Sequence, residues 1–499
     1  MHTDEAVHAM KFGALLENND YHYDPFEYHG PTLNYFTLIP AWLISAKNIT
    51  QINEVTLRIV PVFFGLVLIL ILLLMREGLS CPVILVSGLF TAVSPAMVFY
   101  SRYYIQEMLL VAFTFAVIVA VYRYFKNNNI LWALVAGVSV GLMYATKETC
   151  IIAFFAMALA AILTYLVQKN RKQASLHLNK ISFWHVFAGV SAALIVSILF
   201  YSSFFSYPHG VVDSVLTFKN YLGRGAGHQA AHIHPWFYYL KLLLFSKYPG
   251  RPLWSEAFIV LLALAGLFSA VSPHKNKYID ARLHYFISFY SIIMILIYSI
   301  IPYKTPWSML GFYHGLILLA GIGTVYIFKV IRKKTYRAVF VIIFVAGFCH
   351  LLYQSIFLNY KYDADPSNPY VYAHTSKDIF YIKRRVEEMA SVSKNGKSLV
   401  IGVICPGSDY WPLPWYLRSF PNVGWYDKVD FNAPVAPLYI ASPAVEDSLL
   451  QMIYETPPPG ERNLYVPLFD SYTELRPGIE LRGYVVKYLW DEYWHKQGE

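Results

Sequence analysis

The stretch RIVPVFFGLVLILILLLM, residues 58–75, sets the class of this protein. A run of about 20 mostly apolar residues is long enough to cross the hydrocarbon core of a bilayer as one helix. Nine further runs of similar character follow, so the sequence predicts an α-helical multi-pass membrane protein. The ten predicted spans lie near 58–75, 82–99, 105–125, 131–146, 149–167, 183–203, 254–271, 283–303, 308–328 and 337–357.

The composition of the whole chain agrees with this class. Of 499 residues, 57% are hydrophobic and 14% are charged, whereas a soluble globular chain usually carries about 25% charged residues. The net charge of +9 is spread through an apolar chain and forms no basic patch, which excludes a disordered or nucleic-acid-binding protein. The four cysteines are too few and too scattered for a disulfide framework or a zinc site.

The short loops between the predicted spans differ in positive charge. Five alternate loops hold 15 cations, whereas the three short loops of opposite parity hold one each, namely Arg102, Lys147 and Lys304. Because cationic loops stay on the cytoplasmic side, residues 1–57, 204–253 and 358–499 are expected on the outer face of the cell membrane. The five cationic loops contain Arg76; Arg123 and Lys126; Lys169, Arg171, Lys172 and Lys180; Lys275, Lys277 and Arg282; and Lys329, Arg332, Lys333, Lys334 and Arg337.

The first 57 residues raise a problem of insertion. No basic region followed by an apolar run of signal-peptide type precedes residue 58, so a further span is expected upstream of Met1. The alternative is that residues 31–46 insert. Both 31–46 and 235–246 are short, start at a proline and carry polar residues, which favours helices lying in the membrane interface.

The tail changes character at Tyr360. After a linker with Asp363, Asp365, Pro366 and Pro369, the apolar runs SLVIGVI (398–404), PLYIAS (437–442) and NLYVPLF (463–469) alternate with helix-like segments 376–394 and 445–454. This alternation predicts a small extramembrane α/β domain over residues 358–499.

Ionisable groups gather in five places on the predicted outer face. Charge beside the membrane is costly and tends to be functional. The clusters are Asp4 and Glu5 with His2 and His8; Arg102 and Glu107 in YSRYYIQE; Lys147 and Glu148 in ATKE; His228, His232 and His234 with Arg224; and Lys304 in PYKTPW.

Each cluster also has a purely structural interpretation. Asp4 and Glu5 suit the first turn of a helix, where acids complement the dipole. Arg102 with Glu107, and Lys147 with Glu148, could be ion pairs that end helices. His232 and His234 fit a solvated loop better than a metal site, and Lys304 fits a side chain that snorkels from a helix break.

Taken together, the clusters suit one chemistry. A carboxylate can act as general base on an acceptor hydroxyl, and cations can hold a phosphate and its developing charge. The apolar spans beside them can accept a lipid tail. This inventory favours transfer of a group from a lipid-linked phosphate donor.

Six segments resemble the GT-C superfamily of multi-span glycosyltransferases, which includes the dolichyl-phosphate-mannose protein mannosyltransferases. They are HTDEAVHA (2–9), YDPFEYHGP (23–31), LRIVPVFFG (57–65), SPAMVFYSRYYIQE (94–107), GLMYATKE (141–148) and PYKTPW (302–307). The sequence is most similar to the archaeal and bacterial branch of flippase-activity-associated membrane proteins. The tail segments DYWPLPWYLR (409–418) and ELRPGIELRG (474–483) also resemble that branch.

The resemblance implies a site and its partners. Asp4 would be the catalytic base, and Glu5 its partner or a metal ligand. Residues 1–57 would form an outer catalytic loop with juxtamembrane helices ahead of a transmembrane domain over 58–357. Substrate-binding candidates are Arg102, Glu107, Lys147, Glu148, His232, His234 and Lys304.

The expected donor is a polyprenyl-phosphate-linked sugar, the acceptor is a glycan or protein hydroxyl, and the reaction inverts the anomeric carbon. A divalent metal is the one cofactor left open. A hexosyl or mannosyl transferase is therefore the leading hypothesis. The alternatives are a transporter or accessory factor for lipid-linked sugars, and a non-catalytic scaffold whose outer domain binds an envelope glycan or protein. Charge at span ends on one face, rather than at mid-bilayer, favours the transferase over the transporter.

Overall fold

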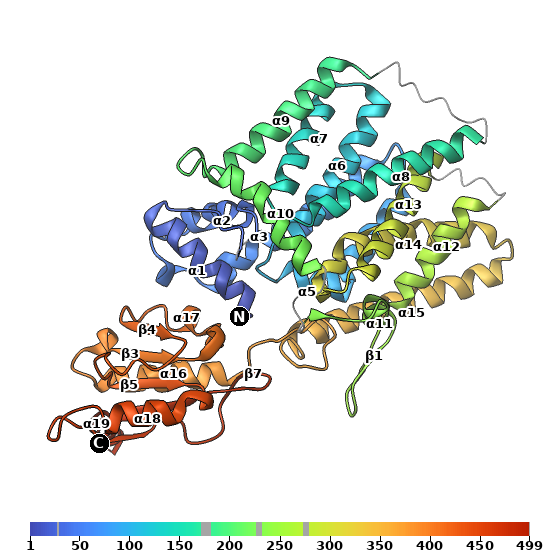
Figure 1. The fold of residues 1–499 in the computed structure, drawn as a ribbon. Coiled ribbons are helices and arrows are strands. Elements are labelled where there is room, and N and C mark those ends of the chain that lie inside the picture. The colour runs from blue at the N-terminus through green and yellow to red at the C-terminus, as the bar shows by residue number, and fades with distance from the viewer. Residues whose placement is uncertain (27–28, 171–180, 226–231, 273–278, 499) are drawn as a thin grey trace. The chain divides into compact units, whose positions relative to one another are not determined.

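The structure, a computed structural model, describes residues 1–26, 29–170, 181–225, 232–272 and 279–498 (Figure 1). The chain divides into two compact units. The smaller contains Met1–Glu17, Ala46–Glu54 and Ala373–Glu499, and the larger contains Asn18–Ser45 and Val55–Tyr372. This division differs from the predicted boundaries near 57 and 357, since two N-terminal segments join the C-terminal domain.

The larger unit is a bundle of helices, and every predicted span falls on one or two of them. Its principal helices are α2 (Thr32–Leu43), α3 (Glu54–Ile71, whose first residue belongs to the smaller unit), η2 (Leu72–Met75), α4 (Cys81–Val93), α5 (Pro95–Ser101), α6 (Glu107–Asn127), α7 (Ile130–Tyr144), α8 (Cys150–Asn170), α9 (Phe183–Tyr201), α10 (Gly210–Gly225), α11 (Tyr238–Leu244), α12 (Ala257–Val271), α13 (Ala281–Ile300), η5 (Pro306–Met309), α14 (Leu310–Val330) and α15 (Lys334–Tyr360).

Within the described residues, seven helices are long and apolar enough to cross a membrane. The helices α4 and α5 make an eighth if they form one span, although they are bent by 62°. The bend falls at Ser94–Pro95, where the proline ring lacks a backbone N–H. The helices α7 and α12 are apolar but shorter, so the count of ten spans stays a prediction.

Small residues allow the closest approach between helices of the bundle. A Cβ atom placed on Gly323 of α14 would lie 1.9 Å from the carbonyl oxygen of Leu262 on α12. This spacing is possible only without a side chain, which is the usual way that membrane helices bring their backbones together.

Loops that are predicted to lie on the same side of the membrane meet at the same end of the larger unit. At one end, the Asp280 amide donates to the Gly78 carbonyl at 2.8 Å, and Lys126 pairs with Asp280 at 2.7 Å. At the other end, the Thr32 amide donates to Ala145 at 3.2 Å, and the His234 amide donates to Pro302 at 3.2 Å. The contacts therefore agree with the predicted alternation, and the side that each end faces stays a prediction.

The segment 204–253 contains structure that its sequence did not reveal. The helix α10 covers Gly210–Gly225, and the strands β1 (Ser246–Lys247) and β2 (Leu253–Trp254) form a short hairpin after α11. The two predicted interfacial segments are helical as expected, as α2 and α11.

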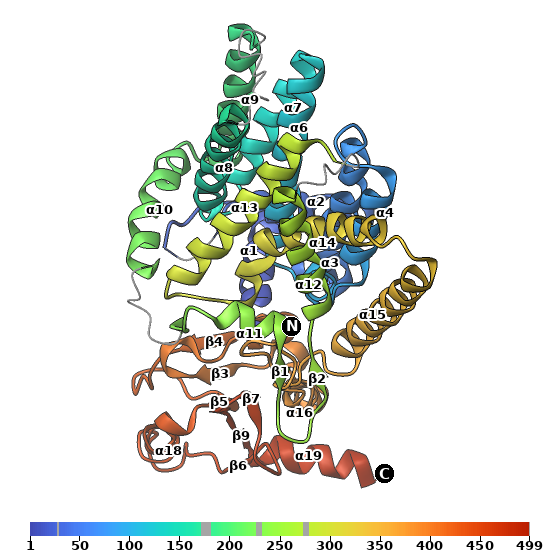
Figure 2. The same ribbon diagram turned by 90° about the vertical axis from the view of Figure 1, so that its right-hand side faces the viewer.

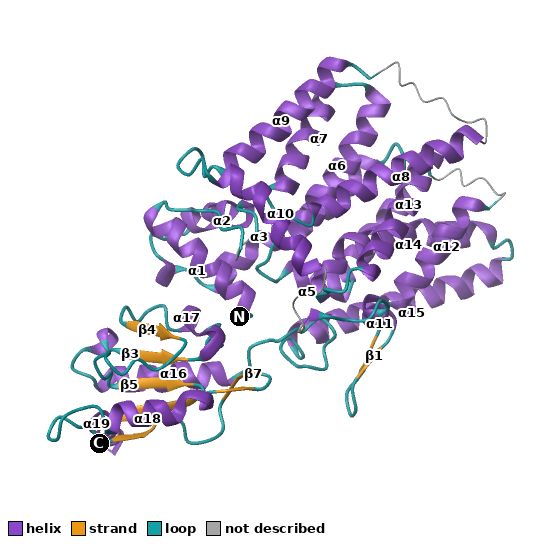
Figure 3. Cartoon of the chain, viewed as in Figure 1, coloured by secondary structure: helices purple, strands orange, loops and turns teal. Residues whose placement is uncertain are grey.

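The smaller unit contains a five-stranded mixed sheet in the order β4-β3-β5-β9-β6 (Figures 2 and 3). The strands β3 (Ile401–Ile404), β4 (Val423–Tyr426) and β5 (Leu438–Ala441) are parallel, whereas β9 (Arg482–Val486) is antiparallel to β5 and β6 (Tyr465–Pro467). The predicted runs 398–404, 437–442 and 463–469 are confirmed as strands β3, β5 and β6.

The remaining elements of the smaller unit are mostly helical. They are α1 (Thr3–Asn18), η1 (Ile49–Gln51), α16 (Asp378–Val392), η6 (Gly396–Ser398), η7 (Pro406–Ser408), α17 (Leu413–Tyr416), η8 (Pro443–Val445), α18 (Glu446–Tyr454), a small hairpin of β7 (Glu474–Arg476) and β8 (Ile479–Glu480), and α19 (Lys487–Gly498). The predicted helical segments 376–394 and 445–454 are confirmed as α16 and α18. The predicted α/β domain is therefore present.

Candidate functional site

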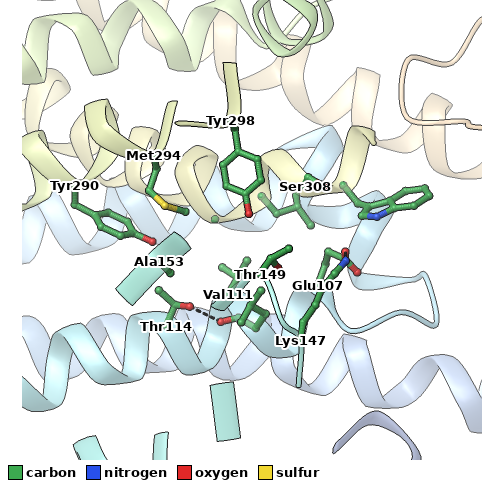
Figure 4. A pocket seen from close by; sticks show the side chains of 14 residues that line it. Glu107, Val111, Thr114, Lys147, Thr149, Ala153, Tyr290, Met294, Tyr298 and Ser308 are labelled. Atoms are coloured by element: carbon green, nitrogen blue, oxygen red, sulfur yellow. Dashed lines mark hydrogen bonds and ion pairs between the residues drawn. The ribbon is translucent and has the colours of Figure 1, made fainter. Parts of the chain in front are cut away.

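A small pocket with a cavity volume of about 30 Å³ lies among α6, α8, α13 and α14 of the larger unit (Figure 4). It brings together three of the segments singled out in the sequence, through Glu107 of YIQE, Lys147 of ATKE and Trp307 of PYKTPW. Its full lining is Glu107, Leu110, Val111, Thr114, Lys147, Thr149, Ala153, Tyr290, Met294, Tyr298, Trp307, Ser308, Leu310 and Gly311.

The charged part of this pocket is an ion pair between Lys147 and Glu107. Both side chains are more than 90% buried. The expected pairs were Arg102 with Glu107 and Lys147 with Glu148, and both were wrong. Residues 147 and 148 are neighbours in a tight loop, so their side chains leave the backbone in different directions and find different partners.

The rest of the lining combines apolar surface with hydroxyl groups. Leu110, Val111 and Met294 are apolar, whereas Tyr290 and Tyr298 carry phenolic hydroxyls. The hydroxyl of Tyr290 is buried and has no hydrogen-bond partner in the part of the chain that the structure describes. The pocket can thus offer both a charged group and an apolar wall to one ligand.

Glu148 is the centre of a second polar cluster. Its carboxylate accepts from the Tyr23 hydroxyl at 2.8 Å and lies 2.9 Å from Nδ1 of His29. Burial alone would raise the pKa of the Glu148 carboxyl, but the interactions with His29, a backbone amide and the Tyr23 hydroxyl together outweigh burial and hold this pKa below its usual value. Glu148 is therefore ionised and orients the His29 ring.

The loop that carries His29 is fastened to the ATKE loop. The hydroxyls of Thr32 and Thr146 are 2.8 Å apart, and the Thr32 amide donates to the Ala145 carbonyl. A Cβ atom on Gly30 would lie 2.2 Å from that same carbonyl oxygen. Gly30 is therefore required for the close approach of two segments that are more than 100 residues apart.

Arg102 lies away from the pocket lining. Its guanidinium donates to the backbone carbonyl of Asn359 at 2.7 Å and stacks 4.6 Å from the ring centre of Tyr360. These contacts join α5 to the end of α15. They give Arg102 a structural explanation that the sequence pattern did not suggest.

His232, His234 and Lys304 come together at two adjacent loops. The Lys304 amide donates to the His232 carbonyl at 2.9 Å, and His232 Nδ1 lies 2.5 Å from the Tyr372 hydroxyl. Burial lowers the pKa of His234, and nearby Lys304 lowers it further. Burial also lowers the pKa of Lys304. His228 and the side chain of Arg224, expected in the same cluster, lie outside the described residues.

Asp4 and Glu5 belong to the smaller unit. They lie in the first turn of α1, as the structural interpretation of this pair predicted. Glu5 is fully buried and accepts from the His2 amide at 3.0 Å, whereas Asp4 is half-buried. Of the two carboxylates, Asp4 is therefore the more accessible to a substrate.

The described residues contain no group of three or more His, Cys, Asp and Glu side chains placed to hold a metal ion. Sequence reasoning missed several residues of the site. His29 and Tyr23 belong to the quoted YDPFEYHGP segment, so that segment was the available signal. Tyr290, Met294 and Tyr298 lie inside an apolar span that shows no local signal.

The chain is similar to known proteins in part of its sequence and across most of its fold. Residues 34–210 match the sequence profile of the dolichyl-phosphate-mannose-protein mannosyltransferase family. No curated protein sequence matches the chain.

Among solved structures, the chain is similar to ArnT from Cupriavidus metallidurans in the apo state, at 12% identity and a TM-score of 0.60. The match covers 96% of this chain and 93% of that chain. The same protein bound to undecaprenyl phosphate matches at 14% identity and a TM-score of 0.59, with the same coverage.

The oligosaccharyltransferase of Archaeoglobus fulgidus, tethered with an acceptor peptide, matches at 12% identity and a TM-score of 0.54, covering 85% of this chain and 60% of that chain. Agreement of this extent at such low identity concerns the fold alone. The chain therefore has the fold of the GT-C superfamily of membrane glycosyltransferases.

Proposed function

We propose that this protein transfers a sugar from a polyprenyl-phosphate-linked donor to an acceptor hydroxyl on the outer face of the cell membrane. The observation that carries the proposal is the pocket in which the Glu107–Lys147 pair adjoins an apolar wall. A lipid-linked sugar phosphate has the same two-part character, with an anionic group next to an isoprenoid chain. The structure of ArnT bound to undecaprenyl phosphate supports this class of donor.

The proposed chemistry is a single displacement. Asp4 accepts the proton of the acceptor hydroxyl as its oxygen attacks the anomeric carbon. The bond from that carbon to the phosphate oxygen breaks, and polyprenyl phosphate leaves with the electron pair. Attack opposite the leaving group inverts the anomeric carbon.

Lys147 is the preferred candidate to offset the charge on the departing phosphate, because it lines the pocket. Lys304, whose ammonium donates to the Ile301 carbonyl, is a second candidate. Arg102 donates to Asn359 and lies away from the pocket lining. Glu107 would hold Lys147 in place, and Glu148 would orient His29. The profile match supports a hexose such as mannose as the transferred group, and a glycan or protein hydroxyl is the proposed acceptor.

The test uses the full chain, purified and reconstituted in liposomes with polyprenyl-phosphate mannose labelled in the sugar. The proposal predicts loss of label from the lipid, with label appearing on an added hydroxyl acceptor. Movement of intact labelled lipid between leaflets without loss of sugar would identify a transporter instead. If the protein neither releases the sugar nor moves the lipid, with any of several sugars tested, the proposal is overturned.

A further inference from the structure

We infer that the α/β domain is the scaffold that holds the Asp4 helix, and that Arg418 and Thr375 are positioning residues for it. This inference rests on the proposed function, since it assigns a role to Asp4 in the reaction. The starting observation is that Met1–Glu17 and Ala46–Glu54 form one compact unit with Ala373–Glu499. The helix α1 is thus separated in sequence from most of its unit by more than 300 residues.

The start of α1 is fastened to the segment that leads into α16. The hydroxyl of Thr375 donates to the Met1 carbonyl at 2.5 Å, and the rings of His2 and His374 lie 4.9 Å apart. The His2 amide in turn donates to the buried Glu5 carboxylate. These contacts fix the turn that carries Asp4.

The end of α1 is fastened through Ile49. The Ile49 amide donates to the Glu17 carboxylate at 2.7 Å, and the Ile49 side chain fills the space beside Gly13, where a Cβ atom would lie 3.2 Å away. The segment 46–54 therefore supports the second half of the helix.

Arg418 holds that segment against the α/β domain. Its guanidinium donates to the carbonyls of Ile49 at 3.2 Å and Ile52 at 2.9 Å, and it stacks 3.8 Å from the ring centre of Trp415. Trp415 Nε1 donates to Glu54 at 2.9 Å. A planar guanidinium can make these contacts together, whereas a lysine ammonium has no such fork.

The contacts form a continuous path from the sheet domain to Asp4. A rigid helix supported at both ends holds a carboxylate more precisely than a free loop does. A misplacement of the Asp4 carboxylate by about 1 Å can reduce the rate on the order of 10²-fold. The α/β domain thus becomes part of the catalytic apparatus because it holds Asp4 in place, although these residues do not contact the substrate. This role also accounts for the DYWPLPWYLR segment, which contains Trp415 and Arg418.

The experiment compares Arg418→Lys and Thr375→Val in the full chain with two matched controls in the same domain. Arg482→Lys changes an exposed arginine that contacts Glu446 and Glu480. Thr473→Val removes a hydroxyl that donates only locally, to Ser471. The first readout is hydrogen exchange of the α1 amides, which does not depend on any activity.

The expected result is faster exchange over residues 3–18 in the two test variants, with the controls unchanged. In the transfer assay, kcat should fall at least tenfold in the test variants, with KM for the lipid donor within twofold of wild type. Combining Arg418→Lys with Asp4→Asn should cost no more than Asp4→Asn alone, because both changes act through the same carboxylate.

Unchanged exchange in α1, or a kcat of Arg418→Lys within twofold of wild type, overturns the inference. If Arg418→Lys fails to fold, Thr375→Val decides the matter by the same criteria. If the wild-type protein transfers no sugar, but the α1 amides still exchange faster in the test variants, the proposed function is overturned. The two failures are therefore distinguishable.

Discussion

The ammonium group of Lys147 pairs with the carboxylate of Glu107, forty residues earlier, and not with the adjacent Glu148. The pair joins the start of α6 to the loop between α7 and α8. Glu148 is thereby left to His29 and Tyr23. The two carboxylates, Glu107 and Glu148, thus have different partners.

The buried pair gives the first prediction. Lys147→Met leaves Glu107 uncompensated in a buried place and should lower the free energy of unfolding by about 3–5 kcal/mol. The double variant Lys147→Met with Glu107→Gln should recover much of that loss, because no buried charge is left unpaired. Thermal unfolding in detergent measures both effects.

Transfer activity should behave differently from stability in this series. The double variant should stay inactive, because the cation proposed to offset the phosphate charge is gone. Sugar transfer by a stable double variant at more than a tenth of the wild-type rate would remove Lys147 from the mechanism.

Gly30 gives a steric prediction. Gly30→Ala places a Cβ atom 2.2 Å from the Ala145 carbonyl, so the HGP loop must move away from the ATKE loop, at a cost of about 1–3 kcal/mol. Transfer should fall at least tenfold, since Lys147 lies two residues from that carbonyl. Gly88→Ala is the matched control, because the nearest atom to its Cβ is 3.7 Å away. Equal stability and activity in the two variants would show that the close approach is unimportant.

The pH dependence follows from Glu148. Its pKa is lowered in the folded protein, whereas an unfolded glutamate titrates near 4.3. The folded state therefore gains stability from ionised Glu148 above about pH 4.3, and this gain is lost as the pH falls through the lowered pKa. The difference in unfolding temperature between wild type and Glu148→Gln should be constant from pH 6 to about pH 5 and shrink below about pH 4. A difference that stays constant down to pH 3 would contradict this role.

Much of the fold could be predicted because its signals are local. Long apolar runs such as 58–75, and short apolar runs such as 398–404 that alternate with helical segments, determine which elements form, whatever segments they later contact. The partners of Lys147, Glu148 and Arg102 could not be predicted, because each choice depends on segments that packing brings together from distant parts of the chain. The same holds for α1, whose sequence does not show that it packs with a domain more than 300 residues later. The helix α10 was missed because an amphipathic helix with polar residues such as Asp213 and Lys219 does not form the continuous apolar run by which spans are recognised.

Cleavage of a lipid-linked sugar phosphate by this protein can be tested by the stoichiometry of its products. Purified full chain is incubated in liposomes with a doubly labelled polyprenyl-phosphate sugar and an excess of acceptor, beside the Asp4→Asn variant. We expect one polyprenyl phosphate to form for each sugar transferred, and the transferred sugar to have the inverted configuration at its anomeric carbon. We expect no turnover by Asp4→Asn in an inserted, folded protein. Full turnover by Asp4→Asn would contradict the assignment of the base, and recovery of only intact donor from wild type would contradict the cleavage itself.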